Sequence, residues 1–307
     1  HIDNLKPLVG FNCLDAQKIF LEFLNVISNY PTLSEVADII VYNPGQYTAG
    51  GTEGVEEYAR RLFIARYNAR GKVSFWFMEE GNDIIRVKIG RRRSEGGNII
   101  SINKKYLKPS LRTLSGVKHL DITGEHEHVI TSIEALNQDT WAIAGLIDRN
   151  KLNRAIKDVN DAYRDKASKL VIARRVRLTS PNVYWLALYS EVPVLYVTSP
   201  FLAVKLKSNE DDISYKIIGL YLNSIITYLQ ILGYFVETQG AWGTLHGETL
   251  WGKLIVPDFS RISREDWDYA LRVFNDVSKA NVGNLYDRIT KRDPKQREID
   301  ETALRLL

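Results

Sequence analysis

Three clusters of basic side chains lie in stretches where the sequence predicts strands and turns. The residues concerned are Arg91, Arg92, Arg93, Lys104 and Lys105 in the first half of the chain, and Lys169, Arg174, Arg175 and Arg177 in the second. Neutralising the phosphates of a nucleic acid requires positive charges that gather on one face. A solvated charge run is the alternative for any single cluster, but the presence of three clusters favours an anionic partner.

The segment 235–257 surrounds Trp242 with glycine and alanine residues. Side chains this small leave the backbone thinly covered, so another molecule can approach it closely. Hydrogen-bonding groups next to this tryptophan suit base edges or phosphates. The candidate contact residues are therefore Gln239, Trp242, Thr244 and His246. A glycine-rich turn around a core tryptophan is the alternative interpretation.

Two segments resemble catalytic motifs only in part. Asn43-Pro44-Gly45-Gln46 lacks the second proline and the aromatic residue that would hold a flipped base, so we expect a simple turn. The glycine-rich stretch 50–54 lacks a following lysine and contains Glu53, which would repel an anion, so we expect a capped helix. No catalytic residue is therefore assigned to this chain.

His126 and His128 flank Glu127, and imidazoles at this spacing can ligate a metal from one side of a strand. No convincing third ligand follows them in the sequence. We expect a solvated turn or strand end here and no metal site. An enzyme with an active site around these three residues remains an alternative.

The order of apolar patterns predicts an α+β fold with two mixed lobes, antiparallel strands and flanking helices, because strands come in runs and do not alternate with helices. Helices are expected over 14–30, 131–166, 214–232 and from 264 onward. The predicted divisions are a helical lead-in (1–30), a first α+β lobe (31–130), a recognition lobe (131–260) and a helical tail (261–307).

Composition narrows the class of protein further. The net charge is +4 over 307 residues, and there is a single cysteine, Cys13, which excludes an internal disulfide and favours the cytoplasm. No apolar run is long enough to span a membrane, so no membrane association is expected. His1 stands where an initiator methionine is usual, which predicts a fragment of a longer protein.

Residues 169–257 resemble the target-recognition region of adenine-N6 DNA methyltransferases of the type II and combined restriction-modification kind. The matching segments are Lys169-Leu-Val-Ile-Ala-Arg-Arg-Val-Arg177, Ala203-Val-Lys-Leu-Lys207, Leu220-Tyr-Leu-Asn-Ser-Ile-Ile226, Gly240-Ala-Trp-Gly243 and Leu250-Trp-Gly-Lys-Leu-Ile-Val-Pro257. The tail around Arg297-Glu-Ile-Asp300 and the stretch 102–123 are similar to the corresponding parts of those proteins.

The resemblance implies a module that binds double-stranded DNA while a separate catalytic domain transfers a methyl group from S-adenosylmethionine. That domain is absent from this chain, so the resemblance implies a non-catalytic fragment whose partners are DNA and its own N-terminal methyltransferase domain. No cofactor is expected in the chain itself. The alternative is a specificity or scaffold subunit that acts through protein contacts at 240–257.

Overall fold

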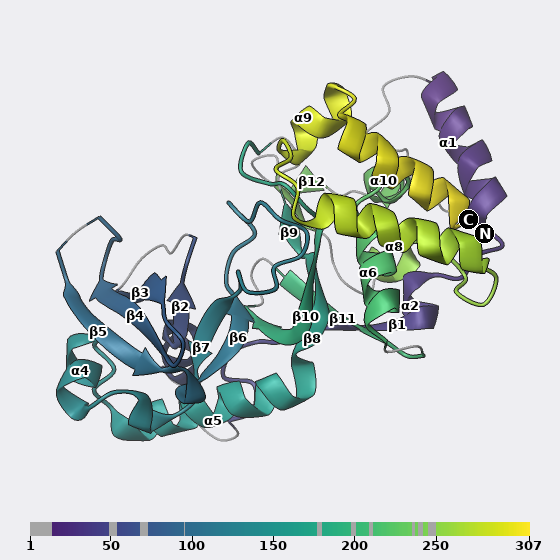
Figure 1. Cartoon of the computed structure of the whole chain (residues 1–307). Helices are drawn as coiled ribbons and strands as arrows, with labels where there is room; N and C mark the ends of the chain where they lie inside the picture. Colours follow the sequence, from purple (N-terminus) through teal and green to yellow (C-terminus); the bar gives the residue numbers. More distant parts are fainter. Residues whose placement is uncertain are drawn as a thin grey trace.

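A mixed sheet of ten strands forms the centre of the molecule in a computed structural model (Figure 1). The structure describes residues 14–48, 54–67, 73–94, 96–176, 180–197, 201–208, 211–234, 237–238, 242–244 and 250–307. The strands are β1 (Ala37–Ile40), β2 (Phe63–Ala65), β3 (Ser74–Glu80), β4 (Ile84–Gly90), β5 (Asn98–Asn103), β6 (Leu107–Leu111), β7 (Glu127–Ile130), β8 (Ser168–Ala173), β9 (Arg175–Val176), β10 (Ala187–Tyr196), β11 (Phe201–Leu206), β12 (Glu237–Thr238) and β13 (Trp242–Thr244).

Helices cover this sheet and form the C-terminal part of the chain. The helices are α1 (Leu14–Ile27), α2 (Leu33–Val36), α3 (Val55–Arg61), α4 (Gln138–Ile143), α5 (Arg149–Lys166), α6 (Asp212–Tyr221), α7 (Ile225–Tyr234), α8 (Arg264–Ser278), α9 (Leu285–Thr290) and α10 (Pro294–Arg305), with short 3-10 turns at Lys104–Tyr106, Ile133–Ala135 and Trp251–Lys253. The predicted α+β class is confirmed.

The sheet joins two lobes through a parallel pair of strands. Its order is β1-β11-β8-β10-β6-β7-β2-β3-β4-β5, and β10 pairs with β6 in parallel at Leu195↔Ser110. A second parallel pair, β2 with β3, lies inside the first lobe, and the other neighbours are antiparallel. In Figure 1, β2 to β5 lie with α4 on one side, and β8, β10 and β11 lie with α6, α8 and α10 on the other. The four predicted divisions of the chain stay a prediction.

Helix α5 has the sequence of an amphipathic helix with a capped start. The Asp148 side chain accepts hydrogen bonds from the backbone N–H groups of Asn150 and Lys151, which satisfies donors that have no partner inside the helix. Apolar residues recur at helical spacing on its buried face, at Leu152, Ala155, Ile156, Val159 and Ala162. This face packs against α3 and the sheet.

A buried carboxylate on α5 holds the Asn43–Gln46 turn. Asp158 is fully buried and accepts hydrogen bonds from the Tyr42 hydroxyl (2.8 Å), the Gly45 N–H (2.8 Å) and the Tyr47 N–H (2.7 Å). Gly45 has a φ of 86°, a left-handed conformation that favours glycine. The prediction of a simple turn is therefore confirmed, and its role is to join the chain to α5.

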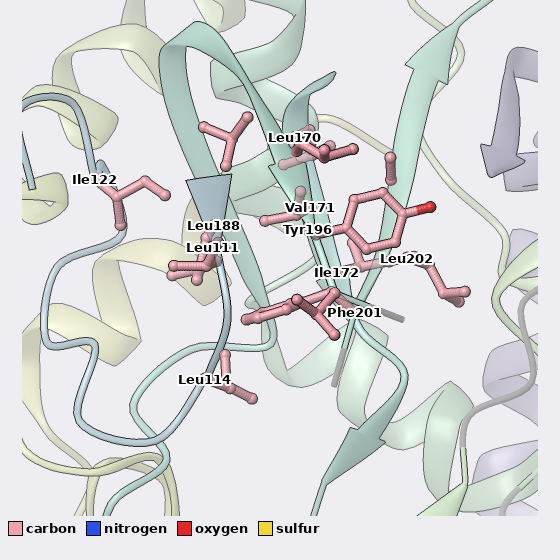
Figure 2. Close-up of a cluster of buried hydrophobic side chains, with 14 of the residues drawn as sticks. Leu111, Leu114, Ile122, Leu170, Val171, Ile172, Leu188, Tyr196, Phe201 and Leu202 are labelled. Carbon is pink, nitrogen blue, oxygen red and sulfur yellow. The ribbon is translucent and has the colours of Figure 1, made fainter. Parts of the chain in front are cut away.

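The core of the second lobe lies between β8, β10 and β11 and the helices above them. Leu188 from β10 is paired with Val171 from β8, and both belong with Leu111 from β6 to one cluster of buried hydrophobic side chains (Figure 2), so the core is continuous across the junction of the lobes. The single apolar helix expected over 214–232 is instead two helices that meet at a buried asparagine. Asn223 bonds the backbone of Leu186, Ala187 and Gly219, and it therefore ties the break between α6 and α7 to β10.

Among the described residues, no single helix combines the length and the apolar composition needed to cross a membrane. Only the bent pair Asp212–Tyr221 and Ile225–Gly233, at an angle of 61°, meets both requirements when its two helices are taken together.

Candidate nucleic-acid interface

The basic stretch 169–177 passes from one sheet to another at Arg174. Strand β8 ends at Ala173, the last residue paired with β11, and β9 begins at Arg175 in a separate three-stranded sheet. Three contacts fix this break: Ala173 pairs with Phe201, its N–H donates to the Leu186 carbonyl (2.7 Å), and its carbonyl accepts from the Trp251 indole N–H (2.8 Å). The two strands are therefore separate, because the tryptophan and the returning chain bind the backbone at Ala173.

The residues between Ala173 and Leu186 connect β8 to β10, and we call this connection the arginine loop (174–185). Its two ends are joined by the hydrogen bond between those two residues, so the loop leaves the large sheet and returns to the same point. Arg174 lies half-buried at its start, Arg175 lies in β9, and Arg177 lies outside the described residues. The structure describes the backbone of Arg175 but not its side chain.

Strand β9 pairs with the tryptophan-bearing hairpin. The register is Gly243↔Val176 and Thr244↔Arg175, and β13 pairs in turn with β12 through Thr238↔Trp242. Residues nearly seventy positions apart in the sequence are thus hydrogen-bonded neighbours in one small sheet, and both come from segments that carry the family resemblance. The side chains of Trp242 and Thr244, and all of Gln239 and His246, lie outside the described residues.

The second half of the 240–257 segment lies in the core. Trp251, Leu254 and Val256 are fully buried, and the Ile255 backbone is bonded to Gln230 and Tyr221. Trp251, Leu254 and Val256 therefore offer no side-chain surface to a protein partner, whereas Ile255 is half-buried and Lys253 is exposed.

In the first lobe, Arg91, Arg92 and Arg93 are exposed on the connection between β4 and β5. This connection is folded back onto the lobe: the Lys88 ammonium donates to the Arg93 carbonyl, and the Arg93 guanidinium donates to the Arg66 carbonyl (3.1 Å). A Cβ atom on Gly97 would lie 2.3 Å from the Ile89 carbonyl oxygen, so the close approach of the two strands requires glycine. Arg91, Arg92 and Arg93 therefore lie on a fixed turn as three exposed cations.

Two of the predicted contact lysines already have carboxylate partners. Lys104 lies 2.9 Å from Glu80, which also pairs with Arg66 at 3.1 Å. Lys169 lies 3.1 Å from Asp212, which Lys216 approaches to 2.6 Å. A phosphate contact by either lysine would require it to leave its carboxylate, so each lysine is less suited to bind a phosphate than an unpaired cation is. Sequence reasoning missed these pairs because both acids come from distant segments.

Asp212 supplies the carboxylate that Lys169 and Lys216 share. Burial on its own would raise the pKa of Asp212, but hydrogen bonds from Lys216, Tyr189 and Lys169 outweigh burial and lower the pKa. The group therefore stays ionised and keeps Lys169 in place at neutral pH. By contrast, Lys105 is exposed and lies over the Tyr106 ring at 4.7 Å, where it remains accessible to an anion.

Glu127 and His128 are buried and His126 is half-buried, which corrects the expectation of a solvated turn or strand end. Glu127 and His128 are 1% and 6% exposed because β7 lies inside the sheet, between β6 and β2. Glu127 accepts the backbone N–H groups of Arg66 (2.7 Å) and Arg112, the residues that follow the ends of those two neighbouring strands. Among the described residues, no group of three His, Cys, Asp or Glu side chains is arranged to hold a metal ion.

Burial raises the pKa of the Glu127 carboxyl above its usual range. It raises the pKa of this carboxyl to about 7, although the two backbone donors act in the opposite direction. The folded chain therefore holds a proton between pH 4.5 and about 7 that the unfolded chain has released. This contribution to stability is full below pH 4.5 and is lost as the pH rises through about 7.

We expect Glu127→Gln to remove this part of the pH dependence. Relative to the variant, the wild type should lose roughly 3 kcal/mol of unfolding free energy between pH 5 and pH 8. Denaturant unfolding at the two pH values measures this difference. Burial lowers the pKa of both His126 and His128, but their contribution is present in both proteins and cancels. Equal pH profiles for the two proteins would show that Glu127 does not titrate in this range.

No protein-family model matches the sequence, and no curated protein matches it. Among solved structures, the chain is similar to the type IIG restriction endonuclease BpuSI, with a TM-score of 0.51 and 12% sequence identity over 95% of this chain. This similarity concerns the fold alone. The matched part is 32% of the BpuSI chain, so this chain spans about a third of that protein's length.

Proposed function

We propose that this chain binds double-stranded DNA in a sequence-specific manner, as the target-recognition part of an adenine-N6 DNA methyltransferase in a restriction-modification system. The observation that carries the proposal is the pairing of β9 with β13, which places the arginine loop beside the glycine-tryptophan hairpin. The fold similarity to a type IIG restriction endonuclease supports a role in the same kind of system.

The two sides of this small sheet would contribute different contacts. Arginine side chains of the arginine loop suit phosphates, which give affinity and orientation without sequence information. The hairpin residues Gln239, Trp242, Thr244 and His246 suit base edges, where a good bidentate contact contributes on the order of 1 to 3 kcal/mol of discrimination. Arg91, Arg92 and Arg93 would add phosphate contacts from the first lobe.

Methyl transfer is assigned to a separate N-terminal domain of the parent protein, together with S-adenosylmethionine. No chemical step is therefore assigned to the residues of this chain.

Fluorescence anisotropy with a labelled random-sequence duplex tests whether the chain binds DNA. We expect the logarithm of the binding constant to fall linearly with the logarithm of the salt concentration. The slope should be about 0.9 for each phosphate that the protein contacts. Selection from a randomised duplex pool should then enrich a short common sequence. Absence of duplex binding at low salt would contradict the proposal and would favour the protein-contact alternative.

A further inference from the structure

The C-terminal helices hold the returning arm of the arginine loop. The first residue of α9, Leu285, donates its N–H to the Val183 carbonyl at 2.9 Å. The side chain of Asn284 caps the same helix by accepting from the Asp287 N–H. The arm is also bound from the first lobe side, where the Gly116 N–H donates to the Asn182 carbonyl at 2.9 Å.

A buried arginine on α9 also contacts the loop. Arg288 is 1% exposed, and its guanidinium carbon lies 3.9 Å from the centre of the Trp185 ring. Its Nη2 donates to the Tyr184 carbonyl at 2.7 Å. Trp185 is itself fully buried and donates its indole N–H to the Lys118 carbonyl at 2.7 Å. Arg288 therefore fixes two successive residues at the base of the loop.

This arginine is a costly residue to bury. Its Nε and Nη1 atoms have no hydrogen-bond partner among the described residues, and burial lowers its pKa to about 10, so the side chain remains charged at neutral pH. An apolar side chain of similar volume often stabilises a fold more than a buried charge does. The stability of the core alone therefore does not explain an arginine at this position. The planar guanidinium, which donates hydrogen bonds in fixed directions and stacks on an aromatic ring, can hold Trp185 and Tyr184 in one arrangement.

We infer that Arg288 is a positioning residue for DNA recognition: through Trp185 and Tyr184 it sets the placement of the returning arm of the arginine loop (180–185). The inference rests on the proposed function and gives the C-terminal helices a part in it. Arg288 lies in the core and would not touch DNA itself.

Amide hydrogen exchange tests the structural half of this inference without DNA. We compare wild type with Arg288→Met, which keeps an apolar stem of similar length, and with Arg288→Lys, which keeps the charge but not the planar fork. The control is Arg297→Met on α10, where the side chain is 80% exposed and pairs with Glu301. We expect exchange in peptides covering 174–185 to speed up on the order of tenfold in both Arg288 variants, with β8 and β10 unchanged.

Unchanged exchange in 174–185 would overturn the inference. Equal acceleration over the whole chain in both variants would also overturn it, because the residue would then act only on general stability. If Arg288→Met does not fold, the exchange rates of Arg288→Lys in 174–185 decide whether the inference holds.

Selection from the randomised duplex pool tests the functional half. Arg288→Met should keep the salt slope of wild type, since no phosphate contact is lost, but should lose enrichment of the wild-type sequence. Retention of that enrichment would overturn the inference. If wild type binds no duplex, the proposed function fails, while the exchange experiment still decides whether Arg288 places the loop.

Discussion

Replacing Arg174 and Arg177 together by alanine should weaken the binding of every DNA duplex on the order of ten- to hundredfold at low salt. Both residues belong to the arginine loop, and contacts to phosphates are the same for all sequences. The slope of the logarithm of the binding constant against the logarithm of salt concentration should fall by about 2, because each lost phosphate contact removes roughly 0.9. Anisotropy titrations over a range of salt concentrations measure both quantities.

A matched control removes two cations elsewhere. Lys291 and Arg297 lie on the C-terminal part of the chain with side chains 72% and 80% exposed, and they pair with Asp287 and Glu301. The double alanine variant of these two residues has the same net charge as the arginine-loop variant. It should retain nearly full affinity. An arginine-loop variant that binds as tightly as wild type at low and at high salt would remove these residues from the interface.

Asp158→Ala should lower the free energy of unfolding by roughly 3 to 5 kcal/mol. The carboxylate is fully buried and accepts from three donors, and its loss leaves the Tyr42 hydroxyl and two backbone N–H groups without their acceptor. Buried donors without partners are expensive, which makes this the largest stability effect that we expect from a single substitution. Chemical denaturation measures it.

The control for this variant is Asp161→Ala, one turn further along α5. Asp161 is partly exposed and forms a 3.1 Å pair with Arg164 on the surface. Such pairs contribute at most about 1 kcal/mol. If both variants unfold at the same denaturant concentration, the carboxylate of Asp158 does not hold the turn at 43–47 in the way that the hydrogen bonds indicate.

Local patterns in the sequence predicted many of the elements but not their pairing. The apolar periodicity predicted α1, α5 and the C-terminal helices, and the β-branched runs predicted strands in both halves of the chain. The parallel contact between β6 and β10 depends on residues about eighty positions apart, and no periodicity reports such a contact. The break at Asn223 was also missed, because it depends on hydrogen bonds to β10 that lie far away in the sequence.

The candidate interface was predictable in its composition and not in its geometry. Clustered arginines and a glycine-tryptophan turn are visible in the sequence. That the two segments lie next to each other, through the pairing of β9 with β13, is a finding of the structure. The carboxylate partners of Lys104 and Lys169 and the burial of Glu127 depend on which strands lie next to one another. Arg288 carries no local signal, because its role comes from the position of Trp185 in three dimensions.

The most direct test of the account is amide hydrogen exchange of the whole chain with and without a random-sequence duplex. The account predicts slower exchange on DNA addition in peptides covering the arginine loop and the hairpin strands β12 and β13. It predicts little change in α4 and α5, which lie away from that sheet (Figure 1). Protection confined to α4 and α5, with none in the arginine loop or the hairpin, would contradict the claim that β9 and β13 form the DNA-binding surface.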